Sequence, residues 1–116
     1  MESQDEKDLT HYYEGVNGQI ALHWSRIDIT RKGFKSFACH GMDGTKTIFL
    51  KSLTALQYKE AGALTNGFIQ FIFPGSIEDK GGLLDAAKDE NTVMFSKEQE
   101  PKFEELKNHI YTRLNF

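Results

Sequence analysis

The sequence predicts a mainly β domain that ends in a single α-helix. Between residues 19 and 95, short apolar segments alternate with polar residues and are separated by glycine-containing breaks. This pattern is typical of strands that bury one face. After residue 100 the apolar positions are Phe103, Leu106, Ile110 and Leu114, whose spacing of three and four places them on one face of a helix.

Length and composition indicate one domain. The chain has 116 residues, is 39% hydrophobic and carries a net charge of −3, so it is long enough to bury a core and lacks the basic excess of a nucleic-acid-binding protein. We predict a disordered acidic tail at residues 1–8 and one domain over residues 9–116. The single cysteine and the absence of a long apolar run favour the cytoplasm and argue against a transmembrane segment.

Seven strands are expected. Ile20 and Leu22 alternate with polar residues, and Ile27 and Ile29 continue the alternation with the opposite parity. A change of parity moves the apolar side chains to the other face, so a tight hairpin or a bulge is expected around Trp24. The predicted strands are Gln19–His23, Arg26–Thr30, Phe34–Cys39, Lys46–Phe49, Leu53–Lys59, Gly67–Phe73 and Thr92–Phe95.

The start of the helix has two candidate signals. Ser96 and Gln99 have the spacing of a capping box, in which each side chain bonds the backbone of the other residue. Pro101 is favoured in the first helical turn. The sequence leaves both starts open.

This order of elements is that of a pleckstrin-homology (PH) domain. Residues Gly18 to Ile110 resemble a bacterial PH-like family of unknown function, whose members often carry short SHOCT tails. The resemblance lies in GQIALHWSRIDITRKG, in TKTIFLKSLTALQYKEAG with GFIQFIFPG, and in ENTVMFSKEQEPKFEELKNHI. It implies a bent seven-stranded β-barrel or sandwich closed by the amphipathic helix. No SHOCT tail is recognised after the helix in this sequence.

The sequence offers little for catalysis or metal binding. Cys39 and His40 are adjacent, with Asp43 close by, but neighbouring residues on a strand point to opposite faces and a zinc site needs three or four converging ligands. A buried cysteine beside a polar loop is the simpler interpretation. The paired glycines of GMDG and GALTNG lack the phosphate-loop pattern and fit hairpin loops better. We therefore predict a non-enzyme without a cofactor or metal.

The candidate binding residues are Trp24, Arg26, Arg31, Lys32 and Lys35. They combine one large aromatic side chain with clustered cations, and buried Trp and Arg contacts often carry much of the energy of an interface. In lipid-binding PH domains a basic set on the early loops grips inositol phosphates. The alternative is that Trp24 covers the core and that the cations only keep a strand edge soluble.

Two functional hypotheses follow. The first is a non-catalytic interaction module that engages a protein partner or assembles with itself into a homo-oligomer in the cytoplasm. The second is a binder of a small anionic ligand, such as a nucleotide signal or a phosphorylated headgroup, and a phage-encoded inhibitor or sponge of host immunity is one form of it. The predicted partners include neither nucleic acid nor a membrane-spanning element.

Overall fold

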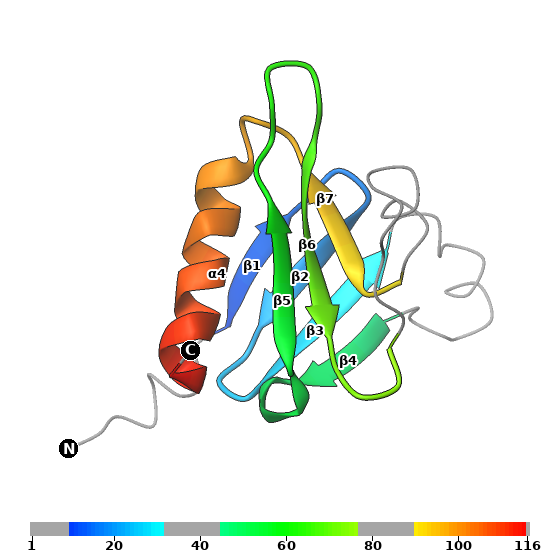
Figure 1. The fold of residues 1–116 in the computed structure, drawn as a ribbon, viewed down its shortest axis with the longest axis vertical. Helices are drawn as coiled ribbons and strands as arrows, with labels where there is room; N and C mark the ends of the chain where they lie inside the picture. Colours follow the sequence, from blue (N-terminus) through cyan, green and yellow to red (C-terminus); the bar gives the residue numbers. More distant parts are fainter. Residues whose placement is uncertain (1–9, 32–44, 77–89, 116) are drawn as a thin grey trace.

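The computed structural model describes residues 10–31, 45–76 and 90–115. Within these residues it contains seven strands, a short 3-10 helix and one α-helix at the C-terminal end (Figure 1). The mainly β prediction with a C-terminal helix is therefore confirmed. None of the described helices is long and apolar enough to span a membrane.

The first four strands form one antiparallel sheet. Its order along the sheet is the order in the sequence, and buried isoleucines face each other across it, with Ile20 beside Ile29 and Ile27 beside Ile48. Cross-strand apolar pairs of this kind fix the register, because a slip of one residue would expose them. The strands are β1 (His11–Glu14), β2 (Gly18–Leu22), β3 (Arg26–Arg31) and β4 (Thr45–Phe49).

β1 is not among the predicted strands. Only Tyr13 of its four residues is buried, and Tyr12 is 63% exposed, so the segment shows no apolar alternation.

The parity change near Trp24 arises from a tight hairpin, which is one of the two predicted causes. β2 and β3 form a tight hairpin in which the His23 amide donates to the Arg26 carbonyl over 2.8 Å.

The last three strands form a second antiparallel sheet. It contains β5 (Ala55–Lys59), β6 (Gly67–Ile72) and β7 (Thr92–Phe95), with β6 in the centre. β5 starts two residues later than predicted, because Leu50–Ser52 form the 3-10 helix η1 and Leu53 is buried at its end. β6 ends one residue early, at Ile72.

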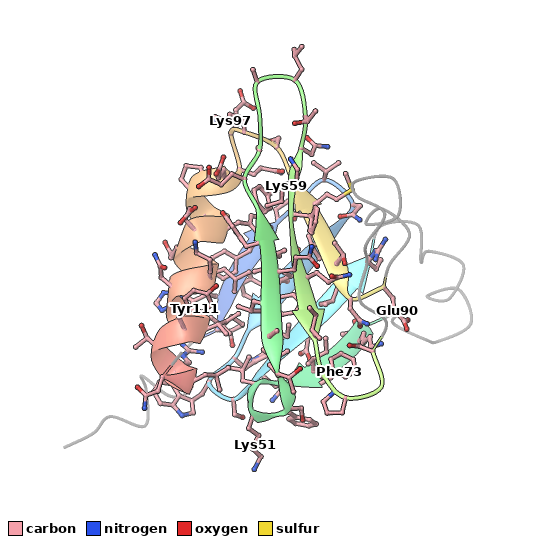
Figure 2. All side chains as sticks on the ribbon, viewed as in Figure 1. Lys51, Lys59, Phe73, Glu90, Lys97 and Tyr111 are labelled. Carbon is pink, nitrogen blue, oxygen red and sulfur yellow. The ribbon has the colours of Figure 1, made fainter. Side chains whose placement is uncertain are left out.

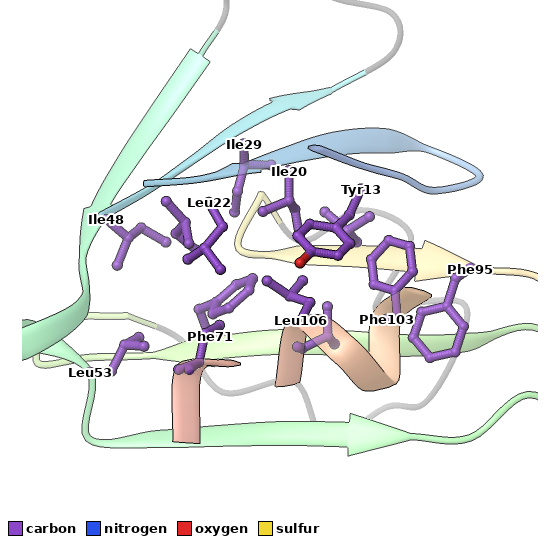
Figure 3. Close-up of a cluster of buried hydrophobic side chains, with 14 of the residues drawn as sticks. Tyr13, Ile20, Leu22, Ile29, Ile48, Leu53, Phe71, Phe95, Phe103 and Leu106 are labelled. Atoms are coloured by element: carbon purple, nitrogen blue, oxygen red, sulfur yellow. The ribbon is translucent and has the colours of Figure 1, made fainter. Parts of the chain in front are cut away.

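The described strands pair only within their own sheet, and the two sheets do not close into a barrel. The core lies between them and is completed by the helix, as Figure 3 shows for Ile20, Phe71 and Leu106. The expectation was a seven-stranded barrel or sandwich; the barrel is not confirmed, because the described strands form two separate sheets with the core between them.

The helix α4 (Glu100–Leu114) covers this core with the predicted apolar stripe. Phe103, Leu106 and Ile110 are fully buried, and Leu114 packs at the edge of the core. Phe103 stacks on Phe95 with ring centroids 4.7 Å apart. Tyr13 donates a 3.0 Å hydrogen bond to the Glu105 carboxylate. Burial, together with this bond, raises the pKa of the Tyr13 hydroxyl.

Both predicted start signals are present in the structure, one after the other along the chain. The Ser96 amide donates to the Gln99 side chain over 2.9 Å, and the Gln99 amide donates to the Ser96 hydroxyl over 3.2 Å. This reciprocal pair holds the turn that precedes the helix. Pro101 then occupies the first helical turn.

Gly67 is required where the β5–β6 hairpin meets the core. A Cβ atom there would collide with the Lys59 carbonyl oxygen and would lie 2.7 Å from both the Ala61 amide and the Phe95 ring. Only glycine allows these segments to approach so closely.

Several predictions lie outside the described residues. They are the acidic tail at residues 1–8, the strand Phe34–Cys39, the cations Lys32 and Lys35, the Cys39–His40 pair with Asp43, and residues 77–89 of the loop before β7.

Candidate functional site

A cleft of about 670 Å³ opens at the end of the molecule where β2 turns into β3 and where α4 finishes. Its apolar lining comes from Trp24, Phe49, Leu50 and Leu114. Its polar lining comes from Ser25, Lys51, Thr112 and Arg113. We call it the Trp24 cleft; Lys51 marks this end of the molecule in Figure 2.

Three segments far apart in the sequence build the cleft. The β2–β3 turn supplies Trp24, the end of β4 with η1 supplies Phe49 and Lys51, and the last turn of α4 supplies Arg113. The Leu50 amide donates to the Ser25 carbonyl over 2.9 Å, which ties η1 to the β2–β3 turn. The walls are therefore connected by backbone hydrogen bonding as well as by packing.

Arg113 fixes the helix end to the same turn. Its Nη1 donates to the His23 carbonyl over 2.7 Å and lies 3.5 Å from the Trp24 carbonyl. The guanidinium carbon is 4.9 Å from the Trp24 ring centroid, a cation–π contact. Burial lowers the pKa of Arg113, which still leaves the group charged. Trp24 is thus held in place by the helix.

The chemistry of the cleft suits binding. Trp24 is 42% exposed and Phe49 is 54% exposed, so two large aromatic side chains remain open to solvent at its mouth. The two charged side chains in the lining, Lys51 and Arg113, are both cations. An apolar group accompanied by a negative charge fits such a surface. Among the residues that the structure describes, the lining contains no carboxylate or imidazole that could act as a general acid or base.

A chain of polar side chains lies beside the β2–β3 turn, outside the cleft. Thr10 Oγ1 is 3.2 Å from His23 Nδ1, and His23 Nε2 is 3.0 Å from an Asp28 carboxylate oxygen. Thr47 donates to the other oxygen over 2.6 Å, and Arg26 lies 3.6 Å from it. A hydroxyl, an imidazole and a carboxylate are the residue types of a catalytic triad. None of them lines the cleft, and their geometry steadies the turn that carries Trp24.

The structure separates the predicted binding residues. Trp24 and Arg26 lie at one end of β3, and Arg31 lies at the other end, roughly 16 Å away for five residues of strand. Arg31 donates to the Thr92 carbonyl over 3.2 Å and so links the two sheets. Lys32 and Lys35 lie outside the described residues. Of the three predicted residues that the structure describes, Trp24 lines the cleft and Arg26 and Arg31 do not.

Phe49, Lys51 and Arg113 belong to the cleft but not to the predicted set. The sequence contains a weak indication that Phe49 is exposed. Phe49 follows buried Ile48 and therefore points to the opposite face of β4. Arg113 lies on the polar side of the helix pattern, and its position 90 residues from His23 gives no local signal.

The opposite end of the molecule carries a second, smaller hollow of about 380 Å³, between the β5–β6 hairpin and the start of α4. Carboxylate oxygens of Glu60, Glu100 and Glu104 come within 4.8 Å of one another beside it, which is the spacing of possible metal ligands. Glu100 and Glu104 are paired with Lys97 and Lys107 at 3.7 and 3.4 Å. These pairs offset most of the charge that a metal ion would otherwise balance, and the prediction of no metal stands as a prediction.

Comparison with known proteins identifies a family. No curated protein and no solved structure matches the chain. Residues 23–111 match the family described as Domain of unknown function (DUF4429). The match includes Trp24, Phe49 and Lys51 of the cleft, and it ends just before the part of α4 that supplies Arg113. This match spans most of the chain, and the protein therefore belongs to the DUF4429 family.

Proposed function

We propose that the protein is a non-catalytic interaction module of PH-like architecture that binds a protein partner through the Trp24 cleft. The order of seven described strands followed by one amphipathic helix supports the PH-like assignment. The largely apolar lining, in which the described residues include no carboxylate or imidazole, supports binding rather than catalysis. Fold alone does not determine function, so the argument depends on the cleft.

The observation that carries this proposal is the pair of exposed aromatic side chains at the cleft. Trp24 and Phe49 each keep about half of their surface in solvent and line the same cleft, whereas Tyr13, Phe71, Phe95 and Phe103 are fully buried. Aromatic side chains beside a preformed hollow are typical of interface anchors. Trp24 is also held in one orientation by Arg113, which reduces the entropy lost when a partner binds.

A small anionic ligand is the second candidate, because the cleft is lined by two cations, Lys51 and Arg113. Arg113 already donates to two carbonyl groups of the β2–β3 turn. Arg26 is close to Asp28, and Arg31 lies at the far end of β3. The described cations therefore converge less on one point than a phosphate site requires. This favours the protein partner.

Affinity capture from cells that produce the protein tests the proposal. Wild type is compared with Phe49→Ser and with Tyr12→Ser, a control that removes an equally exposed aromatic outside the cleft. We expect one protein to be captured by wild type and Tyr12→Ser and to be lost with Phe49→Ser. Equal capture by the folded Phe49→Ser variant would remove the cleft as the binding site. A thermal-shift panel of phosphorylated ligands tests the second candidate, since a ligand raises the melting temperature of the state it binds.

A further inference from the structure

Leu64 is the most exposed large apolar residue of the described chain. It is 97% exposed and lies at the tip of the β5–β6 hairpin, which stands out beyond the other elements at one end of the molecule (Figure 1). The Gly62 amide donates to the Thr65 carbonyl over 2.9 Å, so the tip is a closed, ordered turn. A leucine fixed at such a point is already arranged for insertion into a hollow.

The end that carries Leu64 is acidic. Glu98 lines the hollow beside the tip, and Glu60 follows β5 at the base of the hairpin, where its carboxylate lies within 4.8 Å of those of Glu100 and Glu104. Glu60 and Glu98 are both exposed, and neither forms a salt bridge within the described residues. The neighbouring cation Lys97 is occupied by Glu100 and by the Ala61 carbonyl, at 3.7 and 3.4 Å. Lys59 at the base of the hairpin is also exposed and donates only to the Glu60 backbone carbonyl over 3.5 Å, so it offsets one of the two carboxylates. The net free charge around the tip is therefore weakly negative.

The Trp24 cleft has the complementary features at the other end of the molecule. Figure 2 shows Lys51 at the cleft end and Lys59 and Lys97 near the hairpin end. The cleft is hollow, its apolar lining suits a leucine, and its charged lining is positive. Shape, polarity and charge thus match between two surfaces that one molecule cannot bring together, because they face away from each other.

We propose that the protein self-associates head to tail, with the Leu64 hairpin tip of one copy seated in the Trp24 cleft of the next copy. This inference rests on the proposed function of the cleft as a protein-binding site, and it names a second copy of this chain as the occupant. Lys51 and Arg113 of one copy then face Glu60 and Glu98 of the other. A contact between two different surfaces leaves a free tip and a free cleft on every open assembly, so the assembly grows until it closes into a ring or extends as a filament.

The contact is small, because a hairpin tip buries less surface than a permanent interface. The association is therefore weak and is measured with the purified protein by sedimentation, from about 20 μM to about 1 mM. We expect the average mass of wild type to rise above the 13.2 kDa of one chain as concentration increases. Leu64→Asp is expected to weaken the association about tenfold to a hundredfold, from the lost burial of one leucine.

Mixing two defective variants gives the sharpest test. Leu64→Asp disables the hairpin tip and leaves the cleft intact. Phe49→Asp disables the cleft and leaves the tip intact. Each alone is expected to remain at the monomer mass, whereas an equimolar mixture forms a complex of two chains and grows no further. Lys51→Glu replaces Phe49→Asp if circular dichroism shows that the latter is unfolded, and Tyr12→Ser is the control that associates like wild type.

The outcomes separate this inference from the proposed function. A two-chain complex in the mixture alone supports the head-to-tail contact. A mixture that stays monomeric where wild type associates shows that the contact uses other surfaces and overturns the inference. Wild type that remains monomeric at about 1 mM also overturns it. In either case the proposed function is supported if Phe49→Ser loses the captured partner. It is contradicted, independently of self-association, if Phe49→Ser captures the partner as well as wild type does.

Discussion

Replacing Phe103 by alanine tests whether α4 holds the two sheets together. The Phe103 side chain is fully buried, stacks on Phe95 at 4.7 Å and lies 6.2 Å from the Tyr13 ring. Phe103 therefore contacts an aromatic ring of each sheet, Tyr13 in β1 and Phe95 in β7. Removing it leaves a cavity with aromatic walls that are too rigid to collapse into the space.

The expected loss is about 3–5 kcal/mol of unfolding free energy, which combines lost burial, the cavity and the lost aromatic pair. Domains of this size are stable by about 5–15 kcal/mol in total, so the variant is left near the limit of folding. With roughly 4 °C of melting temperature per kcal/mol, the midpoint is expected to fall by about 12–20 °C.

Urea and thermal unfolding followed by far-ultraviolet circular dichroism measure both quantities. Asn108→Ala is the matched control, because Asn108 is exposed on the same helix and its truncation is expected to change stability by less than about 0.5 kcal/mol. The reasoning fails if Phe103→Ala unfolds within about 1 kcal/mol of wild type, since the helix would then not be docked as the structure shows it.

Three further predictions concern single residues. Gly67→Ala is expected to destabilise the protein by several kcal/mol, on the order of the cost of forcing a backbone collision, and soluble yield and melting temperature check it. Burial, followed by the nearby charges of His11 and Arg113, lowers the pKa of His109 below the usual histidine value of 6.5, against a smaller opposing effect of Glu105. The unfolded state then binds more protons than the folded state just below pH 6.5, so the free energy of unfolding should fall as the pH drops through that value. The fall should be smaller in His109→Gln, and equal pH profiles of the two proteins in urea titrations would contradict this. Arg113→Ala should shift the fluorescence of Trp24, the single tryptophan, to longer wavelength, and an unchanged spectrum would show that the stacking contact is absent in solution.

The strands that alternate cleanly could be predicted from the sequence. Ile20 and Leu22, and Ile27 and Ile29, define β2 and β3 and even locate the hairpin between them. The helix was equally visible in the spacing of Phe103, Leu106 and Ile110. β1 could not be predicted, because Tyr13 is its only buried residue and its pairing with β2 is a property of the folded sheet.

The candidate site was harder to predict than the fold. Trp24 could be identified because a tryptophan in a tight turn is unusual, but the cations that accompany it in the structure come from η1 and from α4. Clustering in the sequence instead suggested Arg26 and Arg31, which the extended geometry of β3 carries to opposite ends. Proximity along the chain is a poor guide where the connecting element is a strand.

The position of α4 after all seven described strands has a consequence for synthesis. A ribosome makes both sheets before it makes the segment that covers them. The hydrogen bond between Tyr13 and Glu105 joins residues 92 positions apart in the sequence, so it cannot form until most of the domain has been translated. Until then the apolar faces of both sheets are open to other nascent chains, and slow translation before residue 100 is expected to promote co-translational aggregation or recruitment of a chaperone.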